Sequence, residues 1–113
     1  MSRKLGADAE QRAADFLAGL GYTILERNFT CKMGELDIIA QDADTVVFVE
    51  VRSRSSLSYG LAQETVVAAK RRKLVRTAQL YIQRHDLDCP MRFDVVALGP
   101  AGLEHFPDAF AAL

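Results

Sequence analysis

The sequence has no tryptophan, only three prolines and two cysteines, and its 14 basic residues nearly balance its 15 acidic ones. The cysteines, Cys31 and Cys89, match no CxxC or zinc-binding spacing, so we expect two reduced thiols and no zinc site. No apolar run approaches the roughly 20 residues that span a bilayer, and the first residues lack the apolar segment of a secretory signal. These absences predict a soluble, cytoplasmic protein with no membrane partner.

Several enzyme classes also find no support in the sequence. The chain contains no Gly-rich phosphate loop, no GxSxG motif and no Cys/His nucleophile arrangement. We assign no role to His85 or His105, which lack metal-ligand neighbours. The formal net charge of −1 is not the basic surplus typical of nucleic-acid-binding domains. Since the chain has 113 residues and half are hydrophobic, residues 1–113 are predicted to form a single domain.

The segment from Gly34 to Arg54 is the most informative part of the chain. Residues 35–41 and 45–52 are rich in Ile, Val and Phe, and they flank a short polar turn. Two strands joined by so short a connection must be antiparallel. The segment therefore predicts a β-hairpin.

The register of this hairpin decides whether its charged residues meet. If Gln41 pairs with Val46, Asp37 lies directly opposite Glu50. A slip of one residue would bury Glu50 among aliphatic side chains, which is costly for an unpaired carboxylate. In the preferred register one face carries Glu35, Asp37, Glu50 and Arg52, and the other carries Leu36, Ile38, Ala40, Val47, Val49 and Val51.

Two interpretations of the charged face are open. Directly opposed Asp37 and Glu50 would have Cβ atoms about 4.5 to 5.5 Å apart and would repel each other unless neutralised. Their hard carboxylate oxygens suit Mg²⁺ or Mn²⁺. Alternatively, Glu35 pairs with Arg52 while the other two acids face solvent, as is common on a half-exposed sheet.

The spacing of Asp37 and Glu50-Val51-Arg52 resembles the D…(E/D)xK signature of the PD-(D/E)xK nuclease superfamily. The string GELDIIA…FVEVRSR resembles the YraN-like family of uncharacterised bacterial proteins, and the similarity extends from GADAEQRAADFLAGLGY through Arg92-Phe93-Asp94 to Ala109-Phe110. The resemblance implies an α/β, restriction-endonuclease-like αβββαβ core with a mixed central sheet flanked by helices. It places the chain closest to archaeal Holliday-junction resolvases, which act as dimers, so a homodimer is one expectation.

The resemblance also implies roles for individual residues. Asp37 and Glu50 would be the metal ligands, assisted by Glu35, and Glu10 matches a glutamate that the resolvases supply from an N-terminal helix. Arg52 stands where the superfamily usually has lysine. Arginine stays protonated and cannot accept a proton from water, although it can stabilise phosphate charge. The other interpretation of Glu10 is an ordinary helix-surface residue.

Lys70 departs from the pattern of its helix. On a helical wheel it starts about 40° from the core position Leu74, on the buried side. Its long side chain could extend to water. Alternatively, Lys70 points into the acidic pocket of the hairpin and replaces the missing signature lysine.

Basic charge gathers around the first turns of the same helix. Arg54, Arg71, Arg72 and Lys73 are the predicted nucleic-acid-binding residues, since a locally positive face can hold a phosphate backbone while acids elsewhere balance the total. A solvated helix face is the alternative.

The remaining helices and strands are predicted from hydrophobic periodicity and from the turn residues that interrupt it. We expect a helix over residues 5–19 with Leu5, Ala9, Ala13, Phe16, Leu17 and Leu20 on its buried stripe. We also expect a strand over 22–30 and a Ser-rich loop over 53–60. A helix then begins between 62 and 68 and ends at about 85, and it leads to a strand over 91–98 that is parallel to an earlier strand. Asp94 is expected to be structural, and the tail to form a short strand and a turn begun by Pro107-Asp108.

The predicted function is that of a metal-dependent nuclease-like domain that binds DNA and cleaves its phosphodiesters with Mg²⁺ or Mn²⁺. Asp37, Glu50, Arg52, Lys70 and Glu10 are the candidate catalytic residues. Two alternatives are a catalytically silent nucleic-acid-binding module and a protein-interaction domain with no nucleic-acid role.

Overall fold

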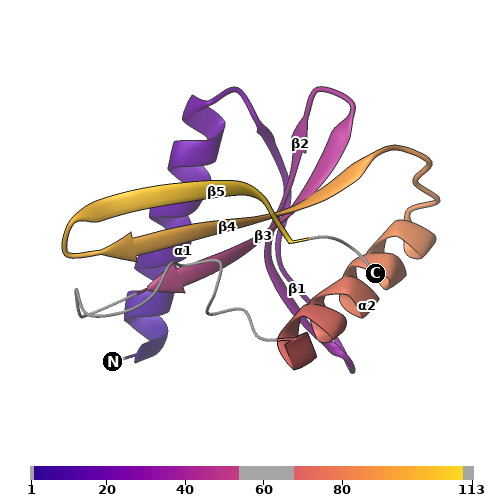
Figure 1. Ribbon diagram of the computed structural model, residues 1–113, viewed down its shortest axis with the longest axis horizontal. Helices are drawn as coiled ribbons and strands as arrows, with labels where there is room; N and C mark the ends of the chain where they lie inside the picture. Colours follow the sequence, from indigo (N-terminus) through magenta and orange to yellow (C-terminus); the bar gives the residue numbers. More distant parts are fainter. Residues whose placement is uncertain (1, 54–67, 111–113) are drawn as a thin grey trace.

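The computed structural model describes residues 2–53 and 68–110, and it consists of one sheet with a helix on each face (Figure 1). The predicted order αβββαβ is confirmed, with one strand added. The elements are α1 (Ser2–Gly19), β1 (Thr23–Cys31), β2 (Gly34–Asp42), β3 (Thr45–Ser53), α2 (Ala68–Arg84), β4 (Met91–Gly99) and β5 (Gly102–Phe110).

The five strands lie side by side in the order β1-β2-β3-β4-β5, so neighbours in sequence are neighbours in the sheet. Every pair is antiparallel except β3 and β4, which are parallel because the chain crosses over through α2. The predicted parallel strand and the mixed sheet are confirmed. The strands also diverge: β1 and β2 run steeply in Figure 1, β4 and β5 run nearly horizontally, and β3 begins beside β2 and bends towards the direction of β4.

Each face of the sheet buries its own apolar cluster. On one face, Ala13 and Leu17 of α1 pack against Val47 and Val49 of β3. On the other, Leu74 of α2 belongs to the cluster that surrounds the fully buried Phe48. Because both faces of β3 are covered, its side chains are almost all apolar, and a charged residue on this strand needs a partner.

Two sequence-based assignments of core residues were wrong. Phe16 of α1 is 36% exposed and Leu20, which follows the helix, is 51% exposed, while Ala14 is buried. The helix sits close to the sheet through small alanine side chains, which turns the larger residues outward. Leu36 was expected beside Ile38, but it packs in the α2 cluster while Ile38 packs in the α1 cluster.

The C-terminal tail also differs from the prediction, since β5 continues through Pro107 and Asp108 to Phe110 instead of turning. A register shift in the pairing with β4 and a φ of 53° at Asp108 accommodate the proline. The backbone N–H of Asp108 donates to Asp94 at 3.0 Å. The Asp94 side chain of β4 therefore satisfies the hydrogen-bonding capacity of this N–H.

Asp94 is structural, as expected, and fully buried. Its carboxylate accepts hydrogen bonds from Arg92 at 2.8 Å and from the His105 ring at 2.8 Å. His105 was assigned no role, yet it is a partly buried partner of this carboxylate. Burial alone would raise the pKa of Asp94, but the hydrogen bonds from His105 and Arg92 outweigh it and lower the pKa.

Within residues 2–53 and 68–110, neither helix is long and apolar enough to cross a membrane.

Candidate functional site

The β2–β3 hairpin places two acidic residues opposite each other where the strands begin to separate. Asp42 pairs with Thr45 and Gln41 with Val46, which confirms the predicted register. The ladder ends at the pair Ile38–Val49. Continuing it by one step sets Asp37 opposite Glu50.

Asp37 is held at this position by a backbone contact. Its carboxylate accepts a hydrogen bond from the Val51 N–H at 2.8 Å, in place of a regular ladder bond. Burial first and the charge of Glu50 second raise the pKa of Asp37 to about 8, against the opposing effect of the Val51 hydrogen bond. Two carboxylates that share a site therefore retain a proton at neutral pH unless another positive charge replaces it.

Glu50 is the one charged residue of β3 that is buried, with 8% of its side chain exposed. Lys70 of α2 reaches its Oε2 with Nζ at 2.5 Å, and Arg52 lies 3.5 Å from the same oxygen. The structure thus brings Lys70 into the acidic pocket, one of its two predicted placements. The ammonium is carried by α2, the helix that connects β3 to β4.

Glu10 of α1 lies near the carboxylate pair. Its Oε1 is 3.8 Å from the Arg27 guanidinium of β1. Burial raises the pKa of Glu10, the Asn28 and Arg27 contacts oppose this, and the charges of Glu35 and Glu50 add to it. Glu10 therefore has Arg27 as its ion-pair partner and lies near enough to Glu50 for the two charges to interact.

A metal ion fits this donor set only in part. The Asp37 and Glu50 oxygens are hard ligands that repel each other, which is the arrangement that a divalent cation stabilises. Among residues 2–53 and 68–110, however, no three acidic, histidine or cysteine side chains meet closely enough to form a complete cage. Mg²⁺ commonly binds through one or two carboxylates and keeps several waters, so the pair is sufficient for that mode.

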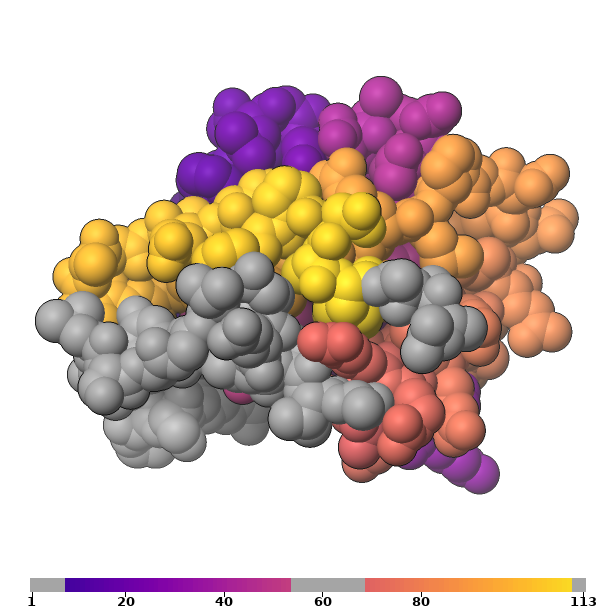
Figure 2. Space-filling model, viewed as in Figure 1, coloured from indigo at the N-terminus to yellow at the C-terminus, as the bar shows by residue number. Residues whose placement is uncertain are grey.

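The predicted nucleic-acid-binding residues differ in their exposure and surroundings. Arg72 and Lys73 are exposed on the first turns of α2. Arg71 is half-buried, with its guanidinium 5.5 Å from the centre of the Phe110 ring, where α2 lies beside the end of β5 (Figure 2). Arg54 and the predicted loop over residues 53–60, apart from Ser53, lie outside the described residues.

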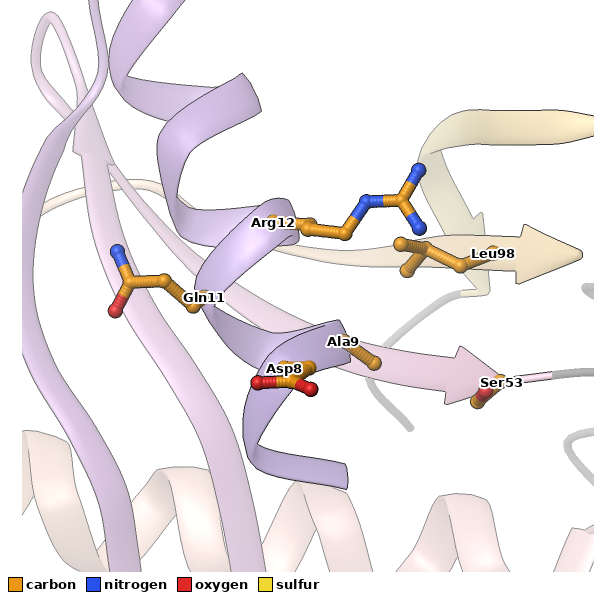
Figure 3. A pocket seen from close by; sticks show the side chains of 6 residues that line it. All are labelled: Asp8, Ala9, Gln11, Arg12, Ser53 and Leu98. Carbon is orange, nitrogen blue, oxygen red and sulfur yellow. The ribbon is translucent and has the colours of Figure 1, made fainter. Parts of the chain in front are cut away.

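A cavity of about 460 Å³ lies between the first half of α1 and the ends of β3 and β4 (Figure 3). Ala9 and Leu98 provide apolar walls, and Arg12 extends beside Leu98. No pattern in the sequence indicated this cavity, because its wall is made by three segments far apart in the chain. Its lining residues are Asp8, Ala9, Gln11, Arg12, Ser53 and Leu98.

Comparison with known proteins identifies the family. The pattern of the uncharacterised protein family UPF0102 matches residues 9–98, a range that includes Glu10, Asp37, Glu50 and Lys70. The chain belongs to UPF0102. This confirms the YraN-like resemblance, and the five-stranded fold is consistent with a restriction-endonuclease-like core.

Members of UPF0102 from distant bacteria are similar over most of their length. A UPF0102 protein of Nitrosomonas europaea is 50% identical over 93 residues, which cover 82% of this chain and 79% of that protein. One from Caldicellulosiruptor saccharolyticus is 48% identical over 95 residues, covering 83% and 80%. One from Nitrosomonas eutropha is 44% identical and covers 96% of this chain and 95% of its own. Family membership brings no activity with it, so function must be argued from the site.

Proposed function

We propose that this UPF0102 protein is a metal-dependent nuclease that binds DNA and hydrolyses its phosphodiester bonds. The observation that carries the proposal is the contact between Lys70 and Glu50. It supplies an ammonium beside a pair of opposed carboxylates, although the sequence has Arg52 in place of the signature lysine. The three charged side chains come from β2, β3 and α2, and only the crossover brings Lys70 to the two carboxylates.

Each residue has a distinct task in this proposal. Asp37 and Glu50 would hold a Mg²⁺ or Mn²⁺ ion, which supplies Lewis-acid polarisation of the phosphate when bound. Lys70 and Arg52 stabilise the negative charge that develops on the phosphate oxygens. Because the Lys70 side chain is 44% exposed, its ammonium is accessible to a substrate as well as to Glu50. Glu10 adds a carboxylate from the other side of the strands.

The exposed residues of α2 would bind the nucleic acid. Arg72 and Lys73 follow Lys70 on the same helix, so a phosphate backbone bound along these turns would pass close to the carboxylate pair. Phosphate contacts of this kind position DNA without reading its sequence.

Cleavage assays with matched variants test the proposal. We expect the wild-type protein to cleave branched, single-stranded or duplex DNA in Mn²⁺, and Asp37→Ala and Glu50→Ala to abolish this. Lys70→Ala should reduce the rate by about 10²- to 10³-fold, the loss typical of one electrostatic stabiliser. Arg84→Ala, in the last turn of the same helix, is the control and should keep the rate within a few-fold. Cleavage unchanged by Asp37→Ala would contradict the proposal.

One observation favours a second candidate, a nucleic-acid-binding module without hydrolysis. Glu50 already has two cationic partners, Lys70 and Arg52, so its charge is satisfied without a metal ion. Calorimetry with Mn²⁺ separates the two. Metal binding that is lost in Asp37→Ala favours the nuclease, and salt-dependent DNA binding without metal binding favours the silent module.

A further inference from the structure

The cavity of about 460 Å³ in Figure 3 lies at the carboxyl ends of the parallel strands β3 and β4. Ser53, the last residue of β3, pairs with Leu98 of β4, and both residues line the cavity. The chain leaves β3 for the crossover and β4 for the β5 hairpin, so the two paths diverge here. In open α/β sheets ligands bind in the crevice beyond such strand ends. The volume is also within the roughly 300 to 1,000 Å³ of small-molecule sites.

Part of the cavity wall is apolar and comes from both the helix and the sheet. Ala9 of α1 and Leu98 of β4 are 7% and 4% exposed, and they belong to the apolar cluster between α1 and the sheet. The wall therefore belongs to the core and does not depend on a surface loop. A planar ring laid against it would remove apolar surface from water.

The charged residues of the cavity have no partners within residues 2–53 and 68–110. Asp8 and Arg12 are four residues apart on α1, a spacing at which opposite charges commonly pair, yet neither forms an ion pair or a hydrogen bond there. Gln11 is different, because its amide group is bonded to Asp15 and Arg27, each at 2.8 Å. Arg12 and Gln11 leave the helix in opposite directions (Figure 3). A carboxylate and a guanidinium are thus available to a ligand.

Among the DNA bases, guanine fits this set of groups best. Its O6 and N7 are both acceptors, which one arginine binds with two parallel hydrogen bonds. Its N1–H and N2 amino group are both donors, which one carboxylate accepts. Adenine has a donor beside N7, and the pyrimidines have no N7. Because base pairing occupies the N1–H and N2 edge, a carboxylate can read that edge only in an unpaired base.

The cavity is close to the acidic pair along β3. Ser53 follows Glu50 by three residues, a distance of about 10 Å in a strand. Side chains alternate along a strand, so Glu50 faces Lys70 of α2 while Ser53 faces α1. A DNA strand with a phosphate at Glu50 would therefore bring a nearby base to the cavity around the end of β3.

We propose that this cavity binds an unpaired guanine of the DNA strand on which the acidic pair acts. Arg12 donates to O6 and N7, and Asp8 accepts from N1–H and the N2 amino group. The face of the ring lies against Ala9 and Leu98. The inference rests on the proposed function, because it takes the ligand to be the substrate strand. It defines the substrate as DNA with unpaired bases, either single-stranded or branched.

Binding of thymine oligonucleotides that carry one central guanine or one central adenine tests this site. Fluorescence anisotropy in metal-free buffer at about 50 mM salt measures affinity without cleavage. We expect the guanine strand to bind about 10-fold more tightly, the discrimination typical of a bidentate base contact. Arg12→Ala and Asp8→Ala should each remove most of this preference. Both residues are exposed, so neither substitution should disturb the fold.

The Asp8 variant separates base recognition from simple charge. Removing an acid reduces the repulsion of phosphates, so Asp8→Ala should bind an all-thymine strand at least as tightly as wild type while it loses the guanine preference. Arg84→Ala removes a positive charge outside the cavity and should keep the full preference. Equal binding of the guanine and adenine strands by wild type would overturn the proposal. A preference unchanged in Arg12→Ala and Asp8→Ala would also overturn it.

Other outcomes distinguish this inference from the proposed function. A guanine preference without cleavage in Mn²⁺ would support the cavity site and contradict the nuclease. Cleavage without any base preference would do the reverse. Competition with free GMP and AMP identifies the source of the base: tighter binding of GMP, with no preference between the two strands, would make the ligand a free nucleotide and overturn the proposal. No DNA binding at all would overturn both.

Discussion

At the scale of single residues, charge neutralisation explains most of the site. Asp37 has a strongly raised pKa because it is partly buried beside Glu50, and Glu50 has Lys70 and Arg52 within salt-bridge distance. A functional site that keeps like charges together loses some stability for it. Asp94 is the opposite case, because its carboxylate accepts hydrogen bonds from Arg92, from His105 and from the Asp108 N–H.

The Asp94 network gives a pH-dependent prediction. Asp94 has a lowered pKa in the folded state, so its contribution to stability is fully present above its unfolded pKa of about 3.9 and is lost as the pH falls through its folded value. We expect Asp94→Asn to lower the free energy of unfolding at pH 7 by about 3 kcal/mol or more, because Arg92 then lacks its buried partner. Urea unfolding at pH 7 and pH 3 measures both effects.

A surface acid provides the control for this experiment. Asp88 is exposed, and Asp88→Asn should change stability by less than about 0.5 kcal/mol at either pH. If Asp94→Asn had as small an effect, the network would not stabilise the fold.

At the scale of elements, the two ribbons of the sheet are shaped by residues in the left-handed region. Asn28 turns the β1–β2 ribbon over, and Ala43, with a φ of 57°, closes the β2–β3 hairpin between the paired Asp42 and Thr45. A positive φ at only the first of two turn residues is the pattern of a type II′ hairpin turn, which favours glycine there. Alanine is therefore strained at this position.

We expect Ala43→Gly to stabilise the protein by about 0.5 to 1 kcal/mol, since relief of the strain exceeds the added entropy of the unfolded chain. Thermal unfolding measures it. Ala101→Gly, in the turn between β4 and β5, is the matched control: Ala101 has no positive φ, so glycine there should be neutral or slightly destabilising. Equal effects of both substitutions would show that the Ala43 conformation carries no strain.

At the scale of the whole molecule, a net charge of −1 conceals an uneven distribution. Glu10, Asp37 and Glu50 gather where the strands separate, and Arg72 and Lys73 lie exposed on the adjoining helix. The helix would hold a DNA backbone close to these acidic residues. Because carboxylates repel phosphates, the backbone could approach them only if positive charge were added between them.

The salt dependence of DNA binding tests this distribution. Each of Arg72→Ala and Lys73→Ala should weaken binding uniformly across sequences and reduce the slope of log K against log salt by about 1. Fluorescence anisotropy between about 50 and 200 mM salt measures the slope. Arg84→Ala, in the last turn of the same helix, should leave it unchanged. Equal slopes for all three variants and wild type would place the DNA elsewhere.

The sequence determined by itself the elements whose signals are local. The hairpin register followed from keeping Glu50 off the aliphatic face, although Glu50 is buried beside Lys70 and Arg52, and the helices and strands followed from periodicity and turn residues. The family resemblance added Asp37, Glu50 and Glu10 as candidates for one site.

Only the tertiary structure decided how distant segments meet. Lys70 could extend to water or to the hairpin, and the crossover through α2 took it to Glu50. His105 became a partner of Asp94 because β5 pairs with β4. Leu36 changed sides because the strand turns over at Asp37. Contacts of this kind depend on packing between elements, which local patterns in the chain do not encode.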